Sequence, residues 1–385
     1  MAQDYYEGVI NNIDTLHVAG GSVPYLKSFP GEGKTALMRE MSQRPTVRTA
    51  TGEAPIGGFT TLLLGTMDET DLAGIPLEGS VERGGKEWPT TRNATPQWAV
   101  EAARVADTGA VYYVLMDEVT RAKQDVQGAG LNVLSSHALP NGFILPPGVR
   151  FLLAGNGVEH DASAYDLIPA LTNRLTHMEF SPPMSDWAKK MTTNFGQPCS
   201  ASELRWRGVV AGYLASNPQA ARQTANDDRK AGWVSKRSWD NVARYLGAIP
   251  EGGEINSAVV DGTIGKGQSD PFLAYVNGLV LPEPKEILAD PSVLDGMVKP
   301  LLWAALNNLA VHVLYEDASE ANSDKGIAVL NYAASENADI ATMVLNTVVI
   351  KSIELYPGYS RKVSGLIGKN FHEVSGMIDK FAQNK

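Results

Sequence analysis

Short apolar runs alternate with amphipathic stretches through the first half of the chain. Because two of the runs, Ala110–Met116 and Val149–Ala154, are almost wholly apolar, we expect central parallel strands buried on both faces. The pattern predicts an α/β fold in which helices cover a parallel five-stranded sheet. The expected strands are Tyr25–Phe29, Phe59–Leu64, Ala110–Met116, Val149–Ala154 and Leu175–Phe180, and the expected helices between them are Thr35–Ser42, Pro96–Asp107 and Gln124–Ser136.

The pattern changes after Ser181-Pro182-Pro183, where only helical periodicity follows. We therefore predict an αβα core at 1–182, a helical lid at 183–297 and a helical C-terminal extension at 298–385. The expected helices are Asp186–Phe195, Ala201–Ala215, Lys236–Ala248, Asp270–Gly278, Val298–Tyr315 and a segment from Gly326 onward.

Two segments interrupt the α/β pattern. Gly74–Pro89 is rich in glycine and charge, and is expected to be a hairpin or a mobile loop. The second segment contains Asn141-Gly142, a dipeptide that favours a tight hairpin, just ahead of the fourth strand.

Composition narrows the class of protein. The chain has 385 residues, of which 43% are hydrophobic and 20% charged, so a substantial core can form. Its net charge of -10 argues against sequence-independent nucleic-acid binding, although a local basic pore stays compatible with it. The single cysteine, Cys199, allows neither an internal disulfide nor a cysteine zinc site. The N-terminus lacks the pattern of a secretory signal and Leu301–Leu314 is too short to span a bilayer, so we expect a cytoplasmic protein without membrane insertion.

The first chemical motif is Ser28–Thr35, which fits the P-loop pattern except that Ser28 stands where glycine is usual. Small residues let successive backbone amides surround phosphate oxygens, and the following helix adds its positive N-terminal dipole. Lys34 would bind the outer phosphates of ATP, and the Thr35 hydroxyl would ligate Mg²⁺. The predicted nucleotide-binding residues are Ser28, Pro30, Gly31, Glu32, Gly33, Lys34, Thr35 and Ala36.

The second motif is the apolar run Val111–Met116, which ends in Asp117 and Glu118. Adjacent carboxylates at the end of a buried strand are costly unless a metal or hydrogen-bond donors meet them. Asp117 would hold Mg²⁺, and Glu118 would act as the general base that activates water. The alternative is a strand that simply ends in solvent.

Three further residues are candidates for catalysis. Asn156 follows the fourth strand, at the edge where ligands bind in open α/β sheets, although Gly155-Asn156-Gly157 also suits an ordinary turn. Arg174 and Arg237 could each place a guanidinium against the transferred phosphate. An arginine at such a position is also a common solvated surface residue.

The series Lys34-Thr35, Asp117-Glu118, Asn156, Arg174 and Arg237 resembles that of AAA+ ATPases: Walker A, Walker B, sensor 1, arginine finger and sensor 2. Three local runs resemble the MoxR-like branch. They are Asp117–Ala122 for D-E-x-x-R-A, Ser235-Lys236-Arg237 for S-x-R, and Asp71–Gly74 for D-L-x-G. The resemblance covers roughly residues 15 to 290.

This resemblance implies a P-loop NTPase core with a lid behind the nucleotide, and a ring, usually a hexamer, with ATP at the subunit boundaries. Arg174 would then act on the neighbour's nucleotide, and Arg237 would sense the γ-phosphate in its own subunit. MoxR-like proteins usually act as chaperone-like remodelers, often with a von Willebrand factor A domain partner. Gly74–Pro89 resembles their helix-2 insert and Leu139–Pro147 their pre-sensor-1 hairpin, both of which would face the pore.

The chain departs from the family pattern in three places. Ser28 replaces the first P-loop glycine, the interval of 82 positions from Thr35 to Asp117 (117 − 35) indicates an insertion, and 298–385 extends beyond a minimal lid. Helical packing onto the lid or a surface for a partner would each account for that extension.

The leading hypothesis is Mg²⁺-dependent ATP hydrolysis coupled to the remodelling of a partner protein. One alternative is a scaffold subunit that binds nucleotide to assemble and turns it over slowly or never. Another is a DNA-directed AAA+ motor, which the acidic composition disfavours.

Overall fold

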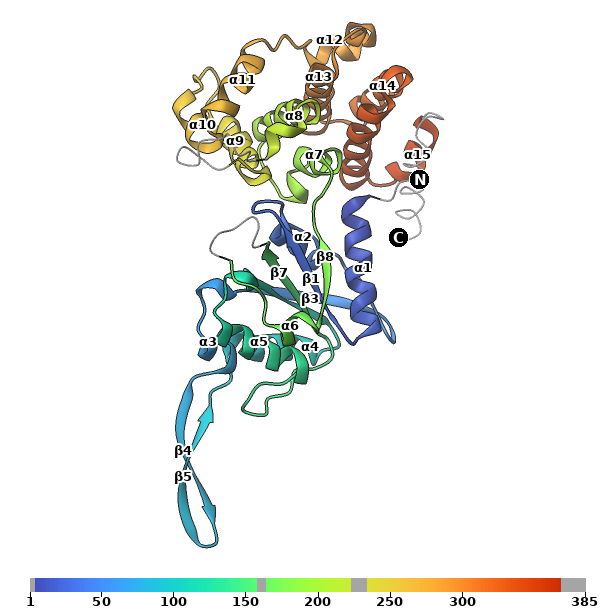
Figure 1. Ribbon diagram of the computed structural model, residues 1–385. Helices are drawn as coiled ribbons and strands as arrows, with labels where there is room; N and C mark the ends of the chain where they lie inside the picture. Colours follow the sequence, from blue (N-terminus) through green and yellow to red (C-terminus); the bar gives the residue numbers. More distant parts are fainter. Residues whose placement is uncertain (1–3, 158–163, 223–233, 368–385) are drawn as a thin grey trace. The chain divides into compact units, whose positions relative to one another are not determined.

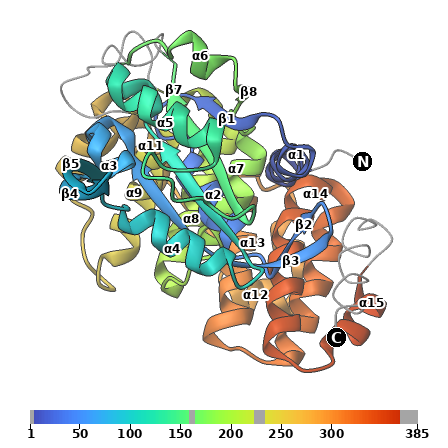
Figure 2. The ribbon, with the colours of Figure 1, turned by 90° about the horizontal axis from the view of Figure 1, so that it is seen from below.

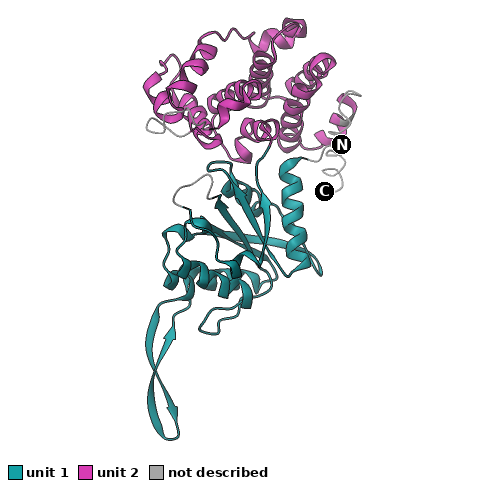
Figure 3. Ribbon diagram, viewed as in Figure 1, with its two compact units in different colours: residues 1–182 teal, residues 183–385 magenta. Residues whose placement is uncertain are grey.

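The computed structural model describes residues 4–157, 164–222 and 234–367. The chain forms two compact units, Met1–Pro182 and Pro183–Lys385, which are coloured separately in Figure 3. Each unit has hydrophobic clusters of its own, and each is described here by itself.

The first unit is built on a six-stranded sheet with the order β2-β3-β6-β7-β1-β8 (Figure 1). The parallel strands are β3 (Gly52–Leu63), β6 (Val111–Asp117), β7 (Val149–Asn156), β1 (Val23–Ser28) and β8 (Leu175–Glu179). The short edge strand β2 (Thr46–Thr49) pairs antiparallel with β3. The predicted five-stranded parallel sheet is therefore present, with a sixth strand that the apolar pattern does not mark.

Strand β6 shows how the two faces of the sheet are covered. Its side chains alternate between two buried clusters: Val111, Tyr113 and Leu115 lie in one, and Tyr112, Val114 and Met116 lie in the other. The first cluster includes residues of α1 (Tyr5–Ala19) and α2 (Lys34–Ser42), and the second those of α4 (Gln97–Ala106) and α5 (Gln124–Ser136). The result is a three-layer αβα arrangement, which can be followed in Figures 1 and 2.

Helix α1 is an element that the sequence analysis missed. It begins after Asp4, whose carboxylate accepts hydrogen bonds from the amides of Tyr6 and Glu7. Its buried residues include Tyr6, Val9, Ile10 and Ile13, a helical spacing that matches one covered face. Shorter elements complete the unit: α3 (Glu69–Ala73), α6 (Pro169–Thr172), and the 3₁₀ turns Leu64–Thr66 and Val119–Arg121.

The segment expected to be a hairpin or loop is an antiparallel hairpin of β4 (Pro76–Arg83) and β5 (Lys86–Asn93). The Asn141-Gly142 segment makes a tight turn, in which the Leu139 amide donates to the Phe143 carbonyl over 2.8 Å. Only an isolated bridge between Ala138 and Ile144 forms there, so this turn is not a two-stranded hairpin.

The second unit is helical and has one continuous hydrophobic cluster that runs from Trp187 to Val363. In this unit helix α8 (Ala201–Ser216) packs against α9 (Lys236–Ala248) and also against α13 (Lys299–Val311), which belongs to the segment beyond 298. Its helices are α7 (Met184–Thr192), α8 (Ala201–Ser216), α9 (Lys236–Ala248), α10 (Ser257–Ile264), α11 (Lys266–Asn277), α12 (Pro284–Ala289), α13 (Lys299–Val311), a π-helical turn (His312–Glu316), α14 (Glu320–Leu355) and α15 (Tyr359–Leu366), with 3₁₀ turns at Asn194–Gly196, Pro218–Ala221 and Pro291–Leu294.

The fold class is therefore α/β, with a P-loop NTPase-like αβα core followed by a helical unit, as the sequence predicts. Among the described residues, no helix combines the length and apolar character needed to cross a bilayer.

Candidate nucleotide-binding site

The P-loop lies between β1 and α2 at the carboxyl edge of the sheet. Ser28 is the last residue of β1, and two glycines of the loop have positive φ angles, 81° at Gly31 and 100° at Gly33. Helix α2 begins at Lys34, and no side chain caps its N-terminus. Its first backbone amides have no carbonyl partner within the helix, so they can donate to an anion, as phosphate-binding loops require.

The Lys34 ammonium sits at the centre of this site, and the residue as a whole is only 8% exposed. Its Nζ donates to Ser28 Oγ over 2.6 Å and to Asn156 Oδ1 over 2.9 Å. Ser28 and Asn156 are register partners in the pairing of β1 with β7, which explains why both reach the same ammonium. Strand pairing thus brings Asn156 to the P-loop, although it lies 122 residues from Lys34 in the sequence.

The acidic pair lies beside the start of α2. Thr35 Oγ1 donates to Asp117 Oδ2 over 2.9 Å, while Asp117 Oδ1 accepts from the Glu118 amide over 2.8 Å. Glu118 itself has a left-handed backbone, with φ 57° and ψ 33°, a conformation that costs energy in a residue other than glycine. The chain therefore turns sharply after Asp117.

The residues present suit a nucleotide with Mg²⁺. Thr35 and Asp117 offer the hard oxygen ligands that Mg²⁺ prefers, and few protein ligands are needed because phosphates and water supply the others. The uncapped amides of α2 and the buried ammonium of Lys34 suit the phosphates. Glu32 is also buried in this loop, while the remaining predicted positions, Pro30 and Ala36, are partly exposed.

Arg174 lies at the amino ends of the strands, opposite the ends that carry the P-loop. It is exposed, directly precedes β8, and its carbonyl accepts a hydrogen bond from the Val23 amide at the start of β1. Val23 to Ser28 spans five residue steps of β1, or about 17 Å at the usual rise of a strand. Arg174 therefore cannot reach the P-loop of its own chain.

Arg237 belongs to the second unit. It is an exposed residue in the first turn of α9, next to the buried Lys236. The helix starts there because Ser235 and Ser238 form a capping box, in which the Ser238 amide donates to Ser235 Oγ over 3.2 Å. The contact of Arg237 with a nucleotide remains a prediction.

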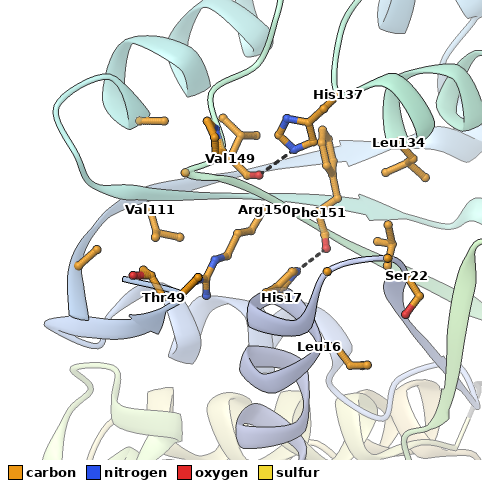
Figure 4. Close-up of a pocket in the computed structure, with 18 of the residues that line it drawn as sticks. Leu16, His17, Ser22, Thr49, Val111, Leu134, His137, Val149, Arg150 and Phe151 are labelled. Carbon is orange, nitrogen blue, oxygen red and sulfur yellow. Dashed lines mark hydrogen bonds between the residues drawn. The ribbon is translucent and has the colours of Figure 1, made fainter. Parts of the chain in front are cut away.

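A pocket of about 710 Å³ lies near Arg174 rather than at the P-loop (Figure 4). It opens at the amino ends of the strands, where its lining includes Val23, Val111 and Val149. The guanidinium of Arg150 lies beside His17 and Thr49, and its Nη2 donates to the Arg48 carbonyl over 2.7 Å. The nucleotide site proposed from the motifs and this pocket are therefore on opposite edges of one sheet.

Two residues beside Glu118 were not predicted to matter. Arg121 Nη1 lies 3.5 Å from Glu118 Oε2, and a Cβ placed on Gly65 would stand 2.9 Å from that same oxygen. Arg121 occurs in the D-E-x-x-R-A run, so the sequence marks its position but does not indicate what its side chain does. Gly65 gives no local signal, since its closeness to Glu118 arises from the pairing of β3 with β6.

Comparisons with known proteins leave the family open. No family profile and no curated protein matches the sequence. Among solved structures, the chain is similar to NtrX from Brucella abortus in complex with ATP (12% identity, 86% of this chain and 68% of that chain, TM-score 0.36). It is also similar to a putative ATPase from Cytophaga hutchinsonii (13%, 89% and 82%, 0.29) and to PCH-2 of C. elegans (11%, 90% and 69%, 0.31). These likenesses are too remote to carry an argument about function.

Proposed function

We propose that this protein is a Mg²⁺-dependent ATPase of the AAA+ type, closest in character to the MoxR-like branch. The observation that carries the proposal is the cluster at the carboxyl edge of the sheet. There the P-loop lysine contacts Asn156, and the P-loop threonine contacts Asp117. A structural role alone gives no reason to gather an ammonium, an amide, a hydroxyl and two carboxylates around an uncapped helix start.

Each residue of the cluster has a definable task in hydrolysis. Lys34 exchanges its bonds to Ser28 and Asn156 for oxygens of the outer phosphates. Thr35 and Asp117 hold Mg²⁺, which when bound would neutralise charge that develops on the phosphates. Glu118 accepts a proton from the attacking water, while Asn156, released by Lys34, orients that water.

We further propose that the protein works as a ring, in the manner of hexameric AAA+ ATPases. Arg174 is too far from its own P-loop to act there, whereas it lies exposed at the edge that a neighbour could approach. In such a ring Arg174 stabilises charge on the neighbour's phosphate, and Arg237 responds to the γ-phosphate in its own subunit. We also propose that hydrolysis drives the remodelling of a client protein, for which a von Willebrand factor A domain protein is one candidate.

Two substitutions test the chemistry. Lys34→Ala should abolish ATP binding, whereas Glu118→Gln should bind ATP with near-normal affinity and lose at least about a hundredfold in kcat, the usual contribution of a general base. Nucleotide binding is measured by fluorescence titration and turnover by phosphate release. Hydrolysis by Glu118→Gln at the wild-type rate would remove the base assignment.

The ring is tested with mixtures. Arg174→Ala should bind ATP normally and fail to hydrolyse it. Mixed with Glu118→Gln subunits, it should regain turnover, because an intact Arg174 then faces an intact Glu118 at some boundaries. No gain at any mixing ratio would count against action on a neighbour. The Glu118→Gln protein held in ATP also serves as bait for the client.

A further inference from the structure

The β4–β5 hairpin is an arm whose side chains contribute nothing to the core. Every residue from Pro76 to Arg92 is exposed, and Figure 1 shows the arm projecting from the first unit beside α3. Its base is fixed by a hydrogen bond from the Ala94 amide to the Ile75 carbonyl and by Asn141, whose Nδ2 donates to the Asn93 carbonyl over 3.0 Å. Because packing in the core of the first unit does not account for this arm, we looked for a binding role for its exposed faces.

The two faces of the arm carry opposite charges. Residues opposite each other in an antiparallel pair share a face, and successive residues alternate between faces. The pairs Leu77–Arg92, Val81–Trp88 and Arg83–Lys86 define a cationic face, and the pairs Glu82–Glu87 and Ser80–Pro89, with Glu78, define an acidic face. Each charged residue of the arm falls on the face of its own sign, three positive and three negative.

Side-chain contacts support this division. The Lys86 ammonium stands 4.9 Å from the centre of the Trp88 ring on the cationic face. On the acidic face the Ser80 hydroxyl donates to the Glu87 carboxylate. Within the described residues none of the charged side chains of the arm forms an ion pair, so both sets of charges remain available.

The cationic face also exposes apolar surface. Leu77, Val81 and Trp88 are 55%, 51% and 49% exposed, and the Val81–Trp88 pair is the third from the tip of the arm. On the acidic face the adjacent rung holds Ser80 and Pro89. A tryptophan ring on one arm and a proline ring at the same level on another could therefore pack together between flanking charges of opposite sign.

The edges of the arm are poorly suited to binding. Pro89 lies within β5 and cannot donate a backbone hydrogen bond, and proline on an edge strand disfavours the addition of another strand. Charged residues along both strands act in the same direction. A partner should therefore be recognised through the faces.

We propose that the cationic face of one arm binds the acidic face of the arm on the next copy of this chain. The inference rests on the ring assembly of the proposed function. Two identical faces would set three like charges against three, so the contact joins different faces and runs head to tail. A head-to-tail contact leaves both faces of every arm occupied only when the series closes, which favours a ring over an open dimer.

Reversal of the charges tests the contact. The cation-reversed variant carries Arg83→Glu, Lys86→Glu and Arg92→Glu, and the acid-reversed variant carries Glu78→Lys, Glu82→Lys and Glu87→Lys. A third variant with all six substitutions keeps the wild-type net charge of -10, because -6 and +6 cancel. Assembly is followed by mass photometry and analytical ultracentrifugation with a non-hydrolysable ATP analogue, at low and high salt.

The wild-type protein and the six-fold variant should assemble at similar concentrations. Each three-fold variant alone should need at least about ten times more protein, because the like charges it brings together cost free energy in the assembled state. An equimolar mixture of the two three-fold variants should assemble like the wild type, since each then offers the face that the other lacks. This rescue cannot arise from damage to the fold.

Four outcomes would overturn the inference: a wild-type protein that stays monomeric, three-fold variants that assemble like the wild type, a mixture that shows no rescue, or a six-fold variant that fails to assemble. Binding of a fluorescent single-stranded oligonucleotide that is lost only on cation reversal, without a change in assembly, would assign the cationic face to nucleic acid and also overturn it. Phosphate release measured in parallel separates the proposed ATPase activity from the proposed assembly. Hydrolysis by a monomeric wild type would agree with the ATPase activity and contradict both the ring and this contact.

Discussion

Gly65 lies where one added carbon would disturb the proposed base. Its Cβ would stand 2.9 Å from Glu118 Oε2 and 3.0 Å from Arg121 Cβ, while its backbone does not require glycine. Since the nearest atom is the end of a flexible side chain, Glu118 can move aside at little cost in stability.

We predict that Gly65→Ala lowers kcat by roughly tenfold, or about 1.4 kcal/mol in the barrier, with little change in ATP affinity. Phosphate release and nucleotide titration measure the two effects. Gly128→Ala is the control, since a Cβ at that position of α5 meets nothing within 4 Å. Unchanged turnover in Gly65→Ala would show that the position of Glu118 tolerates this displacement.

His17 makes stability depend on pH. Burial lowers the pKa of His17 to about 4, and the hydrogen bond from Nε2 to the Phe151 carbonyl only partly opposes this shift. Between its unfolded pKa near 6.5 and pH 4, the unfolded chain binds a proton that the folded chain does not. The contribution of neutral His17 to the free energy of unfolding is therefore full above pH 6.5 and is lost as the pH falls toward 4.

The expected loss between pH 7 and pH 4.5 is about 2.5 kcal/mol from this residue. Urea unfolding at both pH values measures it, with His17→Gln as the comparison because glutamine can donate to the same carbonyl and does not titrate. The pH-dependent loss should be smaller in the variant by about that amount. Equal losses in the two proteins would contradict the assignment.

For single residues, the sequence predicts which side chains belong to the site better than it predicts their contacts. Lys34, Thr35, Asp117 and Asn156 were proposed from motifs, and the structure places them within hydrogen-bond reach of one another in pairs. Ser28 was predicted to bind nucleotide, and its contact with Lys34, whose ammonium donates to the Ser28 hydroxyl, was not predicted. Contacts of this kind depend on strand register, which a single sequence does not state.

Helix packing in the second unit depends on close backbone approach. Gly247 of α9 faces α8, where a Cβ would stand 2.4 Å from the Cα of Glu203. Because the nearest atoms belong to the backbone of α8, one of the two helices must shift to make room.

We predict that Gly247→Ala lowers the free energy of unfolding by about 1–2 kcal/mol, since overpacking outweighs the gain in helix propensity. Gly262→Ala is the matched control: it lies exposed within α10, meets nothing within 4 Å, and should be neutral or stabilising by up to about 1 kcal/mol. Urea denaturation of both variants gives the comparison. Equal stability of the two would refute the packing argument.

Elements with strong local signals were the predictable ones. Helix α9 occupies Lys236–Ala248, as predicted, because the Ser235–Ser238 capping box marks its start. The Asn141-Gly142 turn was expected to open a hairpin, but Pro140, Pro146 and Pro147 near the turn cannot donate to a ladder, and only one bridge forms. Edge strand β2 is too short and too polar to stand out in the sequence.

At the scale of the whole molecule, the two units have separate hydrophobic clusters. We therefore expect two calorimetric transitions, one for 1–182 and one for 183–385. A Mg²⁺–ATP analogue at about a hundred times its Kd should raise the first by roughly 5–10 °C, because Lys34, Thr35 and Asp117, which are proposed to hold the phosphates and Mg²⁺, belong to that unit. Lys34→Ala should remove this shift, and the isolated 1–182 fragment identifies the transition. A single transition that shifts as a whole would show that the units unfold together.

The helical part was divided at 298 because the family resemblance ends near there, and the structure shows no matching break in the hydrophobic cluster. The cluster of the second unit runs through that position, and α13 packs on α8. A separate role for 298–385 remains a prediction. The limit of a family resemblance marks where relatives stop being comparable, which need not be where a core ends.

The base of the arm has a consequence for engineering. Ile75 and Ala94 are joined by one backbone hydrogen bond, so the chain leaves the first unit and returns to it at neighbouring points. Gly74 must stay, because a Cβ there would stand 1.7 Å from the Ala94 carbonyl oxygen. Everything between these two points can in principle be excised and replaced by a short turn, which makes the arm an exchangeable cassette for grafting other recognition sequences.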